Sequence, residues 1–371
     1  MIKTVILCID GLDPAYLEAT PTPAIDDMAA GRLGRPGFYT VGQAVVPTVT
    51  NVNNVSLITG APPSVHGITA NYLLDPRTGQ ETYMESAEFL CAPTILERAG
   101  TLGRSTAVLT AKQKLLDMVG RGADYTLCAE APDASAVAVL GPPPDIYAPD
   151  LNLWLLDALI WVLRERDPDL VYCATTDGMM HHHAPETPAS QAHIRGLDSA
   201  LGRIAETWPQ RQLLLTADHG MAAKSWGVDL EKALLTGGIS ARAIPIIKDR
   251  YVAHHGNLGG AAYVHLSEPE AIDDAMALLR AIPGVEEVHT REDAAARFQL
   301  MAQRIGDLLV LADADTVLGT FDTVRVPVQL RSHGSRHEAA VPILAYGPQI
   351  HVDYRYNYDL TAELDLFSAT S

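Results

Sequence analysis

Three aspartates and three histidines follow apolar segments of the chain or lie in short polar loops between them. They are Asp10, Asp177, Asp218, His181, His219 and His333. Any one of these aspartates, taken alone, is most simply a helix cap or a turn former. Carboxylate oxygens and imidazole nitrogens together, however, are the donors that bind zinc, with about four or five ligands for each ion. The set therefore predicts two Zn²⁺ ions, with Mn²⁺ or Fe²⁺ as alternatives that the sequence leaves open.

Short apolar runs precede all three aspartates and indicate the strands of a buried sheet. The clearest runs are Val5–Ile9, Ser105–Leu109, Leu170–Thr175, Gln212–Ala217 and Val341–Tyr346. Helix-like stretches between them, such as Leu151–Arg166 and Pro188–Thr207, predict an α/β domain with a mostly parallel central sheet flanked by helices. The three aspartates and Lys112 fall at the carboxyl ends of these strands, which is the edge where open α/β sheets bind ligands.

The stretch 239–318 differs from the rest of the chain in the order of its expected elements. It reads as strand Gly260–Leu266, helix Pro269–Ala281, strand Val285–Thr290, helix Glu292–Arg304 and strand Asp307–Ala312. A compact α+β unit of this kind, inserted into a larger domain, is a natural cap. We therefore expect residues 1–238 and 319–371 to form the catalytic core and residues 239–318 to form a small α+β cap subdomain.

Charge and composition narrow the class of protein. The 371 residues carry a formal net charge of −18, which argues against a nucleic-acid or acidic-membrane binder, because both need basic patches. No apolar run approaches the ~18 residues that cross a bilayer, and the first ten residues read as a strand, not as a signal peptide. The cysteines are scattered without paired spacing. We expect a cytoplasmic protein, and a homodimer is left open.

Thr50 lies in a segment with a recognisable pattern. The segment Pro47–Gly60 resembles the nucleophile segment of the nucleotide pyrophosphatase/phosphodiesterase branch of the alkaline phosphatase superfamily, and the Pro-Ser-Val-His-Gly-Ile sequence follows it as in that branch. The resemblance implies an alkaline-phosphatase-like core with a dinuclear metal site. It also favours Thr50 as the nucleophile over two rivals in the same segment, Thr48 after a proline and Thr59 before a glycine turn.

Within this superfamily the chain is most similar to the phosphonoacetate hydrolases. The matching stretches are His66–Tyr72, Leu109–Lys114, Thr175–Asp177, Tyr251–Gly256 and Leu330–Gly334. The resemblance runs from Asp10 to about Gly347 and so covers both core and cap. The paired lysines, Lys112 and Lys114, and the Arg-Ser-His-Gly sequence narrow it to hydrolases of a carbon–phosphorus bond.

The family pattern implies a role for each candidate residue. One zinc ion would take Asp177, His181 and His333, and the second would take Asp10, Asp218, His219 and the Thr50 hydroxyl. Asn71 matches an asparagine that contacts the phosphoryl group, and Lys112 and Lys114 match substrate-binding lysines. The chain departs from the pattern in being short and in a run rich in Met and His at 178–183. That run leaves His182 and His183 as alternatives to His181.

These residue types fit cleavage of a carbon–phosphorus bond. Coordination to a dication lowers the pKa of a hydroxyl, as zinc lowers that of bound water to ~7, and makes Thr50 a nucleophile. Three carboxylates, two dications and a threonine alkoxide balance in charge, so Lys112 and Lys114 leave the pocket positive and suited to a small anionic phosphonate. Lysines on the substrate carboxylate would favour the negative charge that develops on carbon. We expect phosphonoacetate hydrolase activity, with acetate and phosphate as products.

Three other functions fit part of the pattern. A phosphodiesterase or nucleotide pyrophosphatase of the same superfamily would share the metals and the nucleophile. It should also offer an aromatic slot for a base, and no Trp or Phe lies beside the nucleophile segment. A phosphomutase of the superfamily is a third enzyme of this class. A non-catalytic metal- or anion-binding protein would explain the Asp and His residues but would leave Thr50, Asn71 and the lysines without a role.

Overall fold

A seven-stranded sheet forms the centre of the computed structural model, which describes residues 2–75, 78–248, 256–362 and 364. In sheet order β2-β16-β8-β1-β7-β5-β6, the strands are β2 (Gly37–Gln43), β16 (Ala340–Tyr346), β8 (Gln212–Thr216), β1 (Thr4–Cys8), β7 (Leu170–Ala174), β5 (Thr106–Thr110) and β6 (Tyr125–Cys128). The five strands from β8 to β6 run parallel, while β16 is antiparallel to both β8 and β2. The mostly parallel central sheet expected from the sequence is confirmed.

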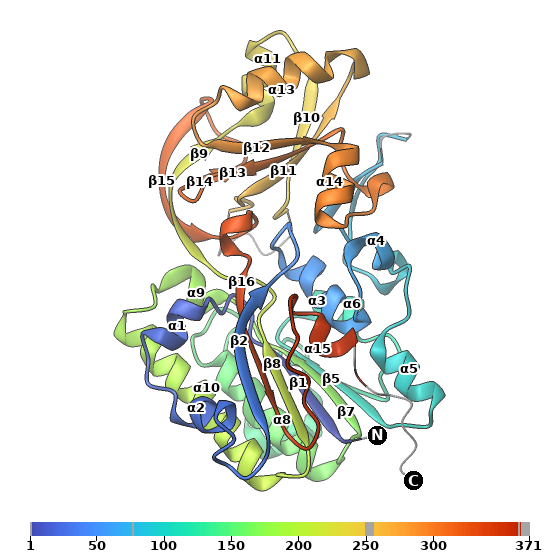
Figure 1. Cartoon of the computed structure of the whole chain (residues 1–371), viewed down its shortest axis with the longest axis vertical. Helices are drawn as coiled ribbons and strands as arrows, with labels where there is room; N and C mark the ends of the chain where they lie inside the picture. The colour runs from blue at the N-terminus through green and yellow to red at the C-terminus, as the bar shows by residue number, and fades with distance from the viewer. Residues whose placement is uncertain (1, 76–77, 249–255, 363, 365–371) are drawn as a thin grey trace.

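Helices cover both faces of this sheet, which explains why its inner strands are continuous apolar runs. Every residue of β1 is buried, and alternate side chains enter different cores. Val5 and Leu7 pack with α8 (Leu151–Glu165) and α10 (Pro188–Thr207). Ile6 and Cys8 pack with α3 (Thr50–Thr59) on the other face. Figure 1 shows α8 and α10 on one side of the sheet and α3 on the other.

The other helices outside the range 239–318 are short. They are α1 (Pro14–Glu18), α2 (Pro23–Ala29), α4 (Pro63–His66), α5 (Ile95–Thr101), α6 (Gln113–Val119), α7 (Ala134–Leu140), α9 (Gly178–His182), α11 (Leu230–Thr236) and α15 (Asp359–Ala362), with 3-10 turns at Ala87–Phe89 and Arg336–Glu338. A hairpin of β3 (Tyr72–Leu74) and β4 (Glu81–Tyr83) follows α4. Within the described ranges, no helix is both long and apolar enough to cross a membrane.

The range 239–318 contains a second, antiparallel sheet in the upper lobe of Figure 1. Its strands are β10 (Ala241–Pro245), β11 (Ala261–Leu266), β13 (Leu308–Ala312) and β12 (Val285–Thr290), and its helices are α13 (Ile272–Arg280) and α14 (Arg291–Phe298), with 3-10 turns at Pro269–Ala271 and Ala302–Arg304. The expected helix over 292–304 is wrong at its end: it stops at Phe298 because Gln299 adopts a left-handed conformation with φ of 53°. The expected helix over 269–281 begins as a separate 3-10 turn.

A three-stranded sheet joins the two lobes. It pairs β14 (Thr316–Leu318) with β9 (Ala222–Val228) and β9 with β15 (Arg325–Ser332). Since β14 lies inside the range 239–318 and its partner strand lies outside, the chain passes between the lobes as paired strands (Figure 1). The division into a core (1–238 and 319–371) and a cap (239–318) therefore stays a prediction.

The parallel strands place their polar ends at one edge of the sheet. Cys8 on β1 is in register with Ala174 on β7 and with Thr216 on β8, and Thr110 on β5 is also in register with Ala174. Asp10, Lys112 and Asp218 follow these strand ends by two residues, and Asp177 follows by three. The sheet thus brings these four polar residues together at the edge formed by the carboxyl ends of its parallel strands.

Candidate metal centre and active site

The carboxyl ends of β1 and β8 bring Asp10, Asp218 and His219 together. All three side chains are buried, and their ligand atoms lie within 4.8 Å of one another. His219 Nε2 lies 3.4 Å from Asp10 Oδ1 and 3.7 Å from Asp218 Oδ2. Gly11 N donates to Asp218 Oδ1 at 3.2 Å, and Asp10 N donates to Thr175 Oγ1 at 3.0 Å. These backbone hydrogen bonds hold the segment after β1 against the ends of β8 and β7. These three side chains form one candidate metal-binding group.

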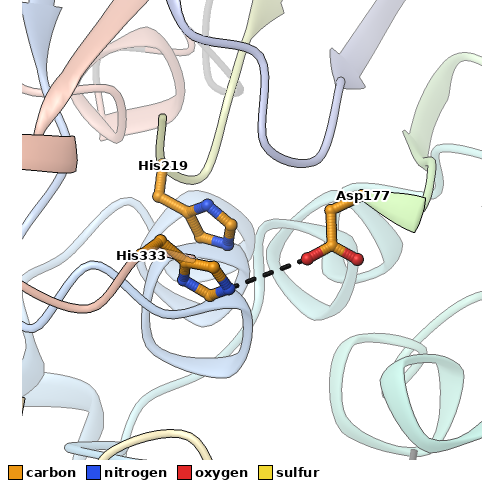
Figure 2. A group of neighbouring side chains, drawn as sticks. All are labelled: Asp177, His219 and His333. Carbon is orange, nitrogen blue, oxygen red and sulfur yellow. Dashed lines mark ion pairs between the residues drawn. The ribbon is translucent and has the colours of Figure 1, made fainter. Parts of the chain in front are cut away.

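A second group forms where β7 and β15 end. Asp177 precedes α9, and its Oδ2 lies 2.9 Å from His181 Nε2 and 3.7 Å from His333 Nε2. The ring of His333 stacks on that of His219, with centroids 3.5 Å apart. Figure 2 shows these two rings side by side with Asp177 facing them. His219 belongs to both groups, because its ligand atom lies within 4.8 Å of those of Asp10 and Asp218 and also within 4.8 Å of those of Asp177 and His333.

A backbone carbonyl orients each of the three histidine rings. Nδ1 lies 2.7 Å from Arg331 O in His181, 2.9 Å from Gly220 O in His219 and 2.7 Å from Thr48 O in His333. Because a carbonyl only accepts hydrogen bonds, Nδ1 carries the proton and Nε2 of the neutral ring carries a lone pair. The Nε2 atoms then face carboxylate oxygens, so that acceptors lie against acceptors. A proton or a metal ion between them satisfies this arrangement, and metal-binding histidines are commonly held by such carbonyls.

The electrostatics of the bare side chains also fit a dication. Burial, together with the carboxylates of Asp177 and Asp218, raises the pKa of Asp10 well above its ordinary value. Burial disfavours charge on Asp177 too, but its contacts with the His181 ring and with Lys112 hold the pKa of Asp177 well below its usual range. Asp10 Oδ1 is buried and accepts no hydrogen bond from the described residues. A divalent ion would relieve the repulsion between the carboxylates and give this oxygen a partner.

Thr50 is the first residue of α3, and its Oγ1 lies 3.3 Å from His219 Nε2. The rival threonines point elsewhere. Thr48 Oγ1 is buried and donates to Ser335 O at 2.7 Å, and Thr59 Oγ1 donates to Val55 O at 2.7 Å inside the helix. Of the three hydroxyls, the one on Thr50 is placed against the candidate metal ligands.

The expected substrate-binding residues meet in one small pocket beside Thr50. It is lined by Val49, Thr50, Asn71, Lys112, Lys114, Asp177, Ile247 and His333. The pocket holds about 300 Å³ of empty space, counting the solvent at its mouth. Lys112 Nζ lies 3.7 Å from Asp177 Oδ1, and the Lys114 side chain, on α6, is largely buried. Ile247, between β10 and β11, contributes an apolar wall from the second lobe.

The three consecutive histidines at 181–183 differ in burial and in their distance from the site. His181 is buried against Asp177, whereas His182 is exposed and His183 is half-buried. The rings of His182 and His183 lie near each other, with centroids 6.5 Å apart. His181 is therefore the histidine of the run that reaches the site. Residues 251–255 of the Tyr251–Gly256 motif lie outside the described residues.

Asn54 is a site residue that the sequence did not single out. Its Nδ2 donates to Asp218 Oδ2 at 2.9 Å and to Thr50 O at 3.0 Å, and its Oδ1 accepts from Tyr172 OH at 2.6 Å. Asn54 thus ties the start of α3 to a candidate metal ligand. Its spacing of four residues from Thr50, which places both on one face of a helix, was a signal that could have found it.

Comparison with known proteins places this site in a family. The family model described as type I phosphodiesterase / nucleotide pyrophosphatase matches residues 4–336. The chain belongs to that family. The expectation of a hydrolase of the phosphodiesterase/phosphatase superfamily is thereby confirmed, and the family is of a metallo-hydrolase type.

Two solved structures match most of their length to the chain. Phosphonoacetate hydrolase from Sinorhizobium meliloti 1021, solved in complex with phosphonoformate and with phosphonoacetate, is 34% identical, with a TM-score of 0.85 over 97% of this chain and 94% of that one. Murine ectonucleotide pyrophosphatase / phosphodiesterase 5 shares the fold at 19% identity, with a TM-score of 0.70 over 98% and 94% of the two chains. A venom phosphodiesterase from Naja atra is 26% identical over 238 residues, which is 60% of this chain but only 26% of that relative.

The donor set leads to a prediction about metal content. Purified protein should contain about two transition-metal ions per chain, and chelation should abolish hydrolysis. Since protons compete for Asp10, whose pKa burial and its neighbours raise, metal binding should weaken as the pH falls. Elemental analysis after dialysis at several pH values, with and without chelator, measures this. Full activity in metal-free protein would contradict the prediction.

Proposed function

We propose that this family member is a phosphonoacetate hydrolase that cleaves the carbon–phosphorus bond of phosphonoacetate to give acetate and phosphate. The observation that carries the proposal is the pocket in which two lysines, Lys112 and Lys114, lie with Thr50 and Asn71 beside the metal-binding groups. The pocket is small and is lined by two lysines, which suits a small anionic substrate. The similarity to a phosphonoacetate hydrolase at 34% identity supports the same assignment.

The chemistry follows from the placement of Thr50. Its hydroxyl gives up its proton, Oγ1 forms a bond to phosphorus, and the carbon–phosphorus bond breaks with its electron pair moving to the methylene carbon. That carbon takes up a proton and leaves as acetate, while phosphorus stays on Thr50 as a phosphothreonine. Hydrolysis of this ester by water then releases phosphate and regenerates the hydroxyl.

The two metal-binding groups would each hold one Zn²⁺, with Asp177, His181 and His333 on one side and Asp10, Asp218, His219 and Thr50 on the other. When bound, the ions would lower the pKa of the attacking hydroxyl and neutralise charge on the phosphoryl oxygens. Asn54 holds Asp218 and the start of α3 in place for this contact.

The lysines explain why a carbon leaving group can depart. Negative charge on the methylene carbon spreads into the neighbouring carboxylate as an enolate. The attraction between this carboxylate and the lysine ammonium groups strengthens as the negative charge grows. It therefore lowers the activation barrier and does not only strengthen substrate binding. Asn71 would contact the phosphoryl group on the opposite side of the pocket. The substrate is a small anionic phosphonate, and a reducing compartment such as the cytoplasm fits the four free cysteines.

A phosphodiesterase is the second candidate, favoured by the family model and by the venom relative. It would use the same metals and nucleophile. Nucleotide substrates need a surface on which the base can stack, and no Phe, Tyr or Trp is among the described residues that line the pocket. The substrate comparison below separates the two.

Rates of phosphonoacetate and bis-p-nitrophenyl phosphate hydrolysis, each measured with and without chelator, test the proposal. We expect chelator-sensitive phosphate release from phosphonoacetate with a higher kcat/KM than for the diester. Efficient diester cleavage without phosphate release from phosphonoacetate would instead support the phosphodiesterase.

A further inference from the structure

A buried ion pair lies next to the loops that carry the candidate metal ligands. Lys224 on β9 and Glu338, in the 3-10 turn before β16, have Nζ and Oε1 2.7 Å apart, and both side chains are fully buried. Lys224 Nζ also donates to Ala314 O at 2.8 Å. Transfer of two charges from water into a protein interior is costly, so a buried pair is weak evidence for stability and needs another explanation.

Glu338 joins two of these loops. Its Oε2 accepts hydrogen bonds from Ser335 N at 3.0 Å and from Ser335 Oγ at 2.8 Å, two residues after His333. Its backbone carbonyl accepts from Gly220 N at 2.7 Å, the residue directly after His219. Glu338 therefore contacts the backbone close to both His219 and His333, whose rings stack.

Thr48 extends the connection to the nucleophile segment. Its Oγ1 donates to Ser335 O at 2.7 Å and accepts from Gly334 N at 2.9 Å. Its carbonyl accepts from His333 Nδ1, and Thr50 follows two residues later. The loop after His333, which Glu338 caps, is thus hydrogen-bonded to Thr48. The carbonyl of Thr48 orients His333, and the chain continues from Thr48 into Thr50.

The charge on Glu338 matters for these bonds. An ionised carboxylate accepts on both oxygens and can take Lys224 on one and Ser335 on the other, whereas a protonated carboxyl would turn one oxygen into a donor.

We propose that Lys224 and Glu338 are positioning residues that hold the His333 loop in register with Thr48 and so preform the metal centre. The inference rests on the proposed metal centre. Neither residue is placed in contact with metal or substrate. They act through Ser335 and Thr48 on the orientation of His333.

Cobalt(II) titration of metal-free protein tests this, because cobalt reports its ligand geometry in visible absorption while zinc is spectroscopically silent. Two double variants remove the ion pair without leaving an unpaired buried charge. Lys224→Met/Glu338→Gln keeps an amide oxygen for Ser335, and Lys224→Met/Glu338→Leu removes the acceptor. For the first we expect cobalt affinity only a few-fold weaker, because the ion pair is lost while an acceptor for Ser335 remains. For the second we expect affinity about 10–100-fold weaker and a changed spectrum.

Arg211→Met is the matched control. Arg211 is buried and pairs with Asp167, but it precedes β8 at the end of the strand opposite to Asp218. It should lower the melting temperature without changing cobalt affinity. The proposal is overturned if the Glu338→Leu double variant binds cobalt like wild type, or if Arg211→Met weakens binding equally. If wild-type protein binds no cobalt, the metal centre itself is wrong, which is a distinguishable failure.

Discussion

Replacement of Thr50 by alanine should reduce phosphonoacetate turnover by on the order of 10⁴-fold or more while both metal ions stay bound. Loss of a covalent nucleophile removes the central step, and such losses in other hydrolases are of this size. The metal ions should remain because the hydroxyl is one ligand among several buried carboxylates and imidazoles. The kcat of the variant, measured beside its metal content, gives the result.

Two further variants sharpen this prediction. Thr50→Ser keeps a hydroxyl at the start of α3 and should retain much more activity than Thr50→Ala. Thr59→Ala removes a hydroxyl that bonds only within α3 among the described residues, and turnover should change little. A phosphorylated Thr50 peptide, found by mass spectrometry after rapid acid quench, would identify the intermediate. If Thr50→Ala works at near wild-type rate, Thr50 is not the nucleophile and Thr48 is the next residue to change.

Lysine variants should separate carbon–phosphorus cleavage from ester hydrolysis. Loss of a charge-assisted contact to the developing enolate should cost about 2–4 kcal/mol of transition-state stabilisation, or roughly 30- to 1,000-fold in rate. Lys112→Ala and Lys114→Ala should therefore depress phosphonoacetate hydrolysis strongly. An activated aryl phosphate ester has no carboxylate to hold, so its hydrolysis should fall much less.

The Lys112 variant needs a check of the metal site. Lys112 Nζ lies 3.7 Å from Asp177 Oδ1 and lowers the pKa of that carboxyl, so its removal also changes the metal site. Lys114 lines the same pocket from α6. Metal content and kcat/KM for both substrates should be measured for each variant. Equal losses on both substrates would mean that the lysines serve the phosphoryl group or the fold, and the phosphodiesterase would then be the better assignment.

The sequence predicted the parts of the fold that depend on local pattern. The buried strands β1, β7 and β8 are continuous apolar runs, and the polar residues after them had to meet once the strands were parallel. The direction of β16 could not be predicted, because a strand buried on both faces reads the same either way. The edge strand β2 was missed because its residues are mostly half-exposed or exposed and it includes two glycines.

The site was predictable to the level of residue type but not of contact. Asp10 and Asp218 could be expected to meet because both follow strand ends, and the choice of His181 over His182 needed the turn of α9. The network through Glu338 and Lys224 had no sequence signal, because it joins residues 114 apart through a buried ion pair. Contacts of this kind depend on tertiary packing, which a linear pattern does not encode.

Product analysis tests the central claim most directly. Phosphonoacetate labelled with ¹³C at the methylene carbon should be followed by ¹³C and ³¹P NMR with the metal-loaded protein. The proposed function predicts that the methylene signal is replaced by the methyl signal of acetate while the phosphonate signal is replaced by inorganic phosphate, in equal amounts and only when metal is present. An unchanged phosphonate spectrum, under conditions where the same protein cleaves bis-p-nitrophenyl phosphate, would contradict it.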